Sequence, residues 1–139
     1  MKRILFILLS VFILGSAKAQ DYKVIVNSSN TISSINKSDL SAFLLKKKTK
    51  WTNGEKVVPV DQSSKSEIRK SFSSDVHGKS VNAIKSYWQQ YVFSGKGTPP
   101  VEKNSDEEII EFIKRNPGAI GYVSAGASIN GVKEVKISN

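Results

Sequence analysis

The segment 57–72, VVPVDQSSKSEIRKSF, contains the residues whose types and spacing are best suited to binding chemistry. A short apolar stretch is followed by a turn with three hydroxyl groups, those of Ser63, Ser64 and Ser66, and then by the start of a helix. Hydroxyl groups and the free backbone N–H groups at a helix N-terminus all donate hydrogen bonds, so together they favour a small anion. Arg69 lies one helical turn further on and reaches either the same point or the surface. The segment therefore predicts an oxyanion site.

Helix capping is the alternative interpretation of the same turn. Ser64, followed three residues later by Glu67, matches the capping box, in which a serine oxygen and a glutamate each accept a backbone N–H. Serine is also a common cap of helices that bind nothing. The two interpretations differ in whether the hydroxyl groups converge on one concave point or face outward, and the sequence leaves both open.

The other reactive residue types give no catalytic pattern. His77 is the only histidine and has no obvious carboxylate partner, so we expect it at the surface, at a helix end. Ser105 and Glu108 match a second capping box, so Glu107 and Glu108 fall in the first turn of a predicted helix, where carboxylates stabilise the helix dipole. The chain contains no cysteine, which excludes thiolate metal sites and cysteine nucleophiles, and it has no P-loop or metal-ligand spacing. We therefore expect no enzymatic activity, no cofactor and no metal site.

The first 19 residues are typical of a secretory signal peptide. Lys2 and Arg3 precede an apolar run, and Ala17-Lys18-Ala19 is an Ala-x-Ala cleavage pattern. The run is shorter than the ~20 residues that a membrane-spanning helix needs. Since no cysteine is present, a bacterial lipoprotein anchor is excluded. We expect a signal peptide at 1–19, one domain at 20–139, and a protein that is periplasmic or secreted after cleavage, without a membrane anchor.

The charge of the predicted mature chain is strongly positive. The full sequence has 21 Lys and Arg against 12 Asp and Glu, a net charge of +9. Three of the basic residues lie in 1–19, so residues 20–139 retain 18 basic and 12 acidic residues, a net charge of +6. A basic exported protein is suited to anionic ligands or envelope partners. Nucleic acid is not an expected partner outside the cytoplasm.

Hydrophobic periodicity predicts strands that alternate with helices. The polar stretches 27–38 and 94–100 are predicted as loops, and Ser38 as the cap of the first helix. The longest helix carries Val81, Ile84, Trp88, Tyr91 and Val92 on its apolar face. This order indicates an α/β fold with a small, mostly parallel sheet flanked by helices. The predicted strands are 22–27, 57–60, 119–123 and 132–137, and the predicted helices are 38–44, 64–76, 81–94 and 105–115.

In such sheets, ligands bind beyond the carboxyl ends of strands and at helix N-termini. The serine-rich turn after 57–60 has that position. So does the loop of small residues that follows the stretch NPGAIGYV, 116–123. Both loops are therefore predicted to face a ligand or a partner.

Several motifs resemble one known family. The pattern F-L-x-K-K-x-x-x-W-x-x-G at 43–54 and the stretch NPGAIGYV at 116–123 are the most specific of them. Between these lie Arg69 to Phe72 and YWQQYVFSGKGTPP at 87–100. Together they resemble the periplasmic phosphate-binding proteins of phosphate ABC transporters, in a short form, over roughly residues 23–137. The resemblance implies one lobe of a type II periplasmic-binding-protein fold, where longer members have two lobes that close on the ligand.

The resemblance also implies where a ligand binds. The family's segment reads Arg-x-x-Gly-Ser-Gly-Thr, often followed by Arg-x-x-Phe, and Ser66, Arg69 and Phe72 match it. Gln62 replaces the family's first arginine, while Glu67 and Ile68 replace a glycine and a threonine. Arginine binds phosphate through two parallel hydrogen bonds and a charge, whereas Gln62 offers hydrogen bonds alone. The ligand-binding residues implied are Gln62, Ser63, Ser64, Lys65, Ser66 and Arg69.

Two functions follow from these observations. The first is an exported solute-binding-like protein that binds phosphate or another small oxyanion, alone or across a dimer. The second is a one-lobe interaction module that binds no solute and docks on an envelope partner. A single lobe leaves its cleft face uncovered, and uncovered faces are often contact surfaces. We therefore expect a homo-oligomer or an envelope protein partner.

Overall fold

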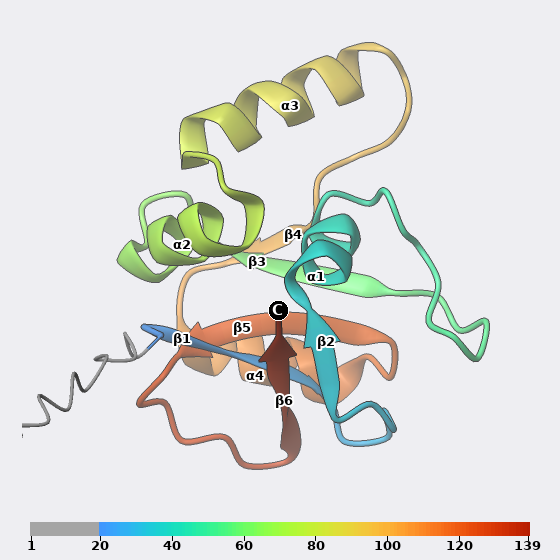
Figure 1. Ribbon diagram of the computed structural model, residues 1–139, viewed down its shortest axis with the longest axis vertical. Coiled ribbons are helices and arrows are strands. Elements are labelled where there is room, and N and C mark those ends of the chain that lie inside the picture. Colours follow the sequence, from blue (N-terminus) through green and yellow to red (C-terminus); the bar gives the residue numbers. More distant parts are fainter. Residues whose placement is uncertain (1–19) are drawn as a thin grey trace, which may run out of the picture.

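Six strands form one sheet in the computed structural model, which describes residues 20–139 (Figure 1). The predicted signal peptide lies outside the described residues. The strand order is β2-β6-β1-β5-β3-β4, and every neighbouring pair is parallel except those that β1 makes with β5 and β6. The expected small, mostly parallel sheet is therefore confirmed. The strands are β1 (Tyr22–Asn27), β2 (Ser34–Asn36), β3 (Val58–Gln62), β4 (Val101–Lys103), β5 (Ala119–Ser124) and β6 (Val132–Ser138).

Helices cover both faces of the sheet (Figure 1). The helix α4 lies against one face, and α1 and α2 lie against the other. The helix α3 lies apart from the sheet, at one end of the molecule. The helices are α1 (Lys37–Leu44), α2 (Glu67–Phe72), which continues as the π-helical turn η1 (Ser73–His77), α3 (Val81–Phe93) and α4 (Asp106–Arg115).

Two apolar layers form the core, one on each side of the sheet. In β5, Ile120 and Tyr122 belong to the layer under α1 and α2. Ala119 and Val123 belong to the layer under α4. A strand that is buried on both faces needs an unbroken apolar sequence. This explains why Ala119-Ile120-Gly121-Tyr122-Val123 has no polar residue.

Two helix caps differ from the predicted ones. Asn36, not Ser38, caps α1, because β2 runs directly into the helix and Asn36 is the last extended residue; its side-chain oxygen accepts from Asp39 N at 2.7 Å. Ser66, not Ser64, caps α2 and accepts from Arg69 N at 3.2 Å. Ser64 instead lies in a turn closed by a hydrogen bond from Ser66 N to Ser63 O of 2.9 Å.

Two strands were not predicted. β2 lies within the stretch 27–38, which was predicted as a loop, and β4 directly follows the loop 94–100. Each has only three residues and forms one edge of the sheet. A three-residue strand has too few residues to show a period of two, so only pairing with β6 or β3 defines it.

The helix α3 buries little of its predicted apolar face. Ile84 and Trp88 are buried against Leu45, and Tyr87 Oη donates to Leu45 O at 3.0 Å. Val92, which was predicted to face inward, is 48% exposed. The reason is that the end of α3 extends beyond the body that its first turns contact. Within residues 20–139, no helix has both the length and the apolar character needed to cross a membrane.

Candidate functional site

The turn after β3 is the segment that the sequence singles out. It lies at the carboxyl end of the strand, beside β4, where Ser63 N donates to Lys103 O at 2.9 Å. Lys65 is exposed at the outside of this turn, and Lys65 N lies 3.4 Å from Ser63 Oγ. Ser66 then begins α2 as its cap. The predicted strand–turn–helix arrangement is therefore present.

Gln62 is buried, and both the nitrogen and the oxygen of its side-chain amide form hydrogen bonds within the protein. Nε2 donates to Asp106 Oδ1 at 2.9 Å and to Tyr122 O at 3.2 Å, while Oε1 accepts from Ser66 Oγ at 3.0 Å. Asp106 Oδ1 also accepts from Ser124 N at 3.1 Å. These bonds join the end of β3, the end of β5 and the start of α4. Gln62 therefore acts as a bridge between three elements.

Arg69 is also buried and is surrounded by carboxylates. Nη1 donates to Gln62 O and to Glu102 Oε1, both at 2.8 Å, and Nε lies 3.5 Å from Asp61 Oδ1. Asp61 further accepts from the Tyr122 hydroxyl. Burial raises the pKa of the Asp61 carboxyl, and the neighbouring Arg69 guanidinium acts against that rise. The Arg69 charge is thus compensated within the protein.

The predicted site residues fall into two groups. Gln62, Ser66 and Arg69 lie together in the internal network, where carboxylates and carbonyls accept their hydrogen bonds. Ser63, Ser64 and Lys65 form the turn outside it. The three hydroxyl groups do not converge, because Ser66 Oγ donates inward to Gln62 whereas Ser64 borders a hollow on the surface.

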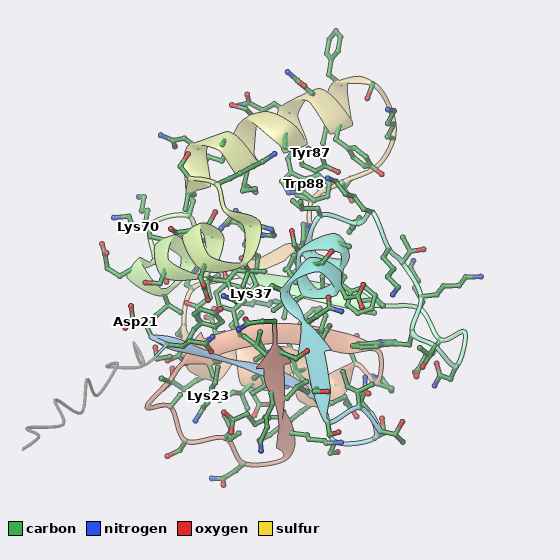
Figure 2. The ribbon with its side chains drawn as sticks, viewed as in Figure 1. Asp21, Lys23, Lys37, Lys70, Tyr87 and Trp88 are labelled. Carbon is green, nitrogen blue, oxygen red and sulfur yellow. The ribbon has the colours of Figure 1, made fainter. Side chains whose placement is uncertain are left out.

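The hollow beside Ser64 has a volume of about 570 Å³ and lies between α2, η1 and the start of α3. We call it the basic hollow. Lys79 and Lys85 make no ion pair among residues 20–139, while Lys70 Nζ contacts Glu67 Oε1 at 2.8 Å. Figure 2 shows Lys70 on α2. No acidic side chain belongs to the described lining, which consists of Ser64, Lys70, Ser74, Gly78, Lys79, Ser80, Val81, Asn82 and Lys85.

These three lysines have no recognisable pattern in the sequence. Lys70, Lys79 and Lys85 belong to three different segments, and lysine is common on any surface, so their spacing in the sequence has no pattern. Only the chain reversal through η1 and Gly78, which adopts the left-handed φ of 63°, brings them to one hollow.

His77 does not have the exposed position that was expected. It lies at a helix end, as predicted, but is half-buried, with Nδ1 2.7 Å from Ser41 Oγ and its ring edge-on to Phe72. Burial, and to a lesser extent the charges of Arg69, Lys79 and Lys47, lower its pKa to about 4. The side chain is therefore neutral at physiological pH. In the described part of the chain, no group of three or more His, Asp or Glu side chains is placed to hold a metal ion.

Comparisons with known proteins place the chain by its structure. No family model matches the sequence, and no curated protein matches it significantly. Solved structures do match, with 18–19% sequence identity. An ABC-type phosphate transport receptor from Vibrio cholerae gives a TM-score of 0.67 at 19% identity, over 84% of this chain and 46% of the receptor. A putative phosphate ABC transporter substrate-binding protein with bound phosphate, from Clostridium perfringens, gives 0.67 at 18% identity, over 84% and 44% of the two chains.

A third solved structure matches with a similar TM-score, identity and coverage. A possible phosphate-binding protein from Planctomyces limnophilus gives a TM-score of 0.65 at 18% identity, over 86% of this chain and 42% of the other. The chain thus spans less than half the length of the solved structures it matches. At this identity the likeness establishes the fold, and it confirms the resemblance on which the motifs had converged. The described chain has the fold of a single lobe of a periplasmic-binding-protein-like receptor, similar to those of phosphate ABC transporters.

Proposed function

We propose that this chain is an exported solute-binding-like protein that binds phosphate or another small oxyanion without chemical turnover. The fold it shares with proteins named as phosphate receptors and phosphate-binding proteins supports the class of ligand. Its net charge of +6 over residues 20–139 supports the sign of the ligand's charge. The proposal also includes cleavage of residues 1–19 and a periplasmic or secreted location.

The basic hollow is the observation that carries this proposal. Lys79 and Lys85 place two uncompensated ammonium groups beside the hydroxyl groups of Ser64 and Ser80. Charge-assisted hydrogen bonds contribute about 1.5–3 kcal/mol each. Two or three such contacts, less the cost of association, correspond to dissociation constants of about 10 µM to 1 mM for an open hollow.

The residues predicted from the sequence have two roles in this proposal. Ser64 borders the anion from the turn, and Ser63 and Lys65 are its neighbours in the chain, outside the lining of the hollow. Gln62, Ser66 and Arg69 hold the turn in place, since their side chains bond to one another and to the ends of the neighbouring strands. Phosphate would therefore meet the outer part of the turn rather than the buried guanidinium.

Calorimetric titration of the purified protein with phosphate, sulfate and small organic anions tests the proposal. We expect saturable binding of at least one oxyanion, with about tenfold weaker binding in Lys79→Gln because one charge-assisted contact is lost. Lys136→Gln, which removes an exposed lysine on β6, is the control for net charge. If no anion binds, or if both variants lose affinity equally, the proposed site is wrong.

An interaction module that binds no solute is the second candidate. The internal network favours it, because Glu102 and Asp106 already accept hydrogen bonds from Arg69 and Gln62. Asp61 is paired with Arg69 as well. Free phosphate must compete with these built-in carboxylates at the position where the family's motif lies. A titration without any anion binding, from a protein that still unfolds cooperatively, would favour this candidate.

A further inference from the structure

A second hollow lies beside α3, and its walls are mainly apolar. Trp88, Val92 and Phe93 line it from the helix, and Pro99 and Pro100 line it from the segment that leads to β4. Its volume is about 660 Å³. We call it the apolar groove. Figure 2 shows Trp88 on the side of α3 that faces the rest of the molecule.

The exposed apolar side chains of the described residues gather at this groove. Phe93 is 94% exposed, and Val92 and Val101 are each 48% exposed. These three are the large hydrophobic side chains that residues 20–139 leave exposed. Val92 and Phe93 line the groove, and Val101 lies between two residues that line it. Exposed apolar side chains that gather in one place indicate a contact surface rather than chance exposure.

Phe93 is the last residue of α3 and also lines the groove. Because its side chain is almost wholly exposed within one copy, the ring is accessible to a second molecule. A two-fold axis near this end would place Phe93 of each copy against the groove of the other, so each contact would occur twice. We infer that a second copy of this chain docks on the apolar groove, with Phe93 exchanged between the two copies.

The charges around the groove also fit a second copy. Arg69 and Lys85 contribute two positive charges to its lining, and Asp61 and Glu102 contribute two negative charges, so the groove is balanced. Residues 20–139 as a whole carry a net charge of +6. Two copies therefore repel one another on average, and the groove is a surface on which they meet without that repulsion. Glu102 Oε1 is paired with Arg69, but the Glu102 side chain is 49% exposed, so Lys85 on α3 and Glu102 on β4 each remain accessible to the opposite charge of the partner.

This inference does not depend on anion binding, and its failure is distinguishable from that of the proposed function. The first test is light scattering and sedimentation equilibrium of the purified protein from about 1 µM to 500 µM. We expect a reversible dimer. Phe93→Ser should raise the dimer dissociation constant by at least about 100-fold, because two rings lose their burial. Since Phe93 is almost wholly exposed within one copy, this variant should fold normally.

The matched control is Gln90→Ser, which changes an exposed residue of the same helix that does not line the groove. It should dimerise as the unchanged protein does. A protein that stays monomeric up to about 500 µM would overturn the inference. Equal dissociation constants for Phe93→Ser and the unchanged protein would overturn it as well.

A cross-linking experiment tests the position of the contact. Because the chain has no cysteine, Phe93→Cys gives a single attachment point for a benzophenone, an apolar aromatic group of similar character. After irradiation, we expect a covalent dimer in which the label has reacted with the segment 97–103 of a second, isotopically labelled copy. Cross-links only to residues that lie outside the apolar groove of the second copy would contradict docking on the groove.

Discussion

At the level of single residues, Arg69 shows how the internal hydrogen-bond network keeps a predicted site residue from binding a ligand. The side chain is only 4% exposed and compensates the buried Asp61 carboxylate. Removing it leaves that carboxylate without its cation, and breaking a buried pair in this way costs about 3–5 kcal/mol. We predict that Arg69→Ala lowers the free energy of unfolding in urea by about 3 kcal/mol. The exposed Lys65→Ala should change it by less than about 0.5 kcal/mol. A stable Arg69→Ala would show that the network is not needed for folding.

The second prediction at this level concerns His77 and pH. The folded protein lowers the pKa of His77 from 6.5 to about 4, chiefly by burial. Between these values the unfolded chain binds the proton and the folded protein does not, so lowering the pH through this window favours unfolding. We predict that the unchanged protein loses about 2 kcal/mol more stability than His77→Gln between pH 7 and pH 4. Parallel stability curves, measured by urea unfolding at several pH values, would contradict the assigned burial.

At the level of elements, Gly118 decides how β5 joins the core. A Cβ atom on Gly118 would lie 2.1 Å from Lys56 O, whereas a Cβ atom on Gly126, after the same strand, would meet nothing within 4 Å. Gly118 O also accepts from Val58 N and from Trp51 Nε1, so neither backbone can move away freely. We predict that Gly118→Ala lowers the unfolding free energy by about 2–3 kcal/mol. Gly126→Ala should leave the urea midpoint unchanged; equal effects would exclude close packing as the cause.

The arrangement of the elements also explains why turn-forming residues, such as Pro117 and Gly118, lie next to β5. Asn116 and Pro117 end α4, and Gly118 then permits the close approach to Lys56, just before the neighbouring strand β3. The last residue of β5 has a different role. Ser124 N is held by Asp106 Oδ1, which ties the end of the strand to the first turn of α4. The loop beyond it connects β5 to β6.

At the level of the whole molecule, the signal peptide predicted from the sequence can be tested directly. The Ala17-Lys18-Ala19 pattern predicts cleavage before Gln20. Intact-mass measurement on protein recovered from the periplasm or the medium should give a chain that begins at Gln20. Ala19→Arg should block cleavage, because the signal peptidase site needs a small residue there. Exported protein that retains residues 1–19 would contradict the prediction.

The sequence by itself determined the fold class, the principal strands and helices, and the likeness to phosphate-binding proteins. These follow from local patterns: the apolar run at 119–123, the capping serine at Ser105, and the motifs at 43–54 and 116–123. Ser105 does cap α4, accepting from Glu108 N at 3.2 Å. Such features depend on neighbours within a few residues, so spacing alone is sufficient to detect them.

Only the tertiary structure decided what the site contains. The sequence places Gln62 and Arg69 beside the serine turn, but it cannot show that Asp106 and Glu102, more than 30 positions away, bind them. The sequence also cannot show that lysines from three segments form the basic hollow, or that the end of α3 is exposed. The physical reason is that hydrogen-bond donors and apolar faces are assigned to partners by three-dimensional packing. A sequence shows which groups are available, and the fold decides which of them remain free.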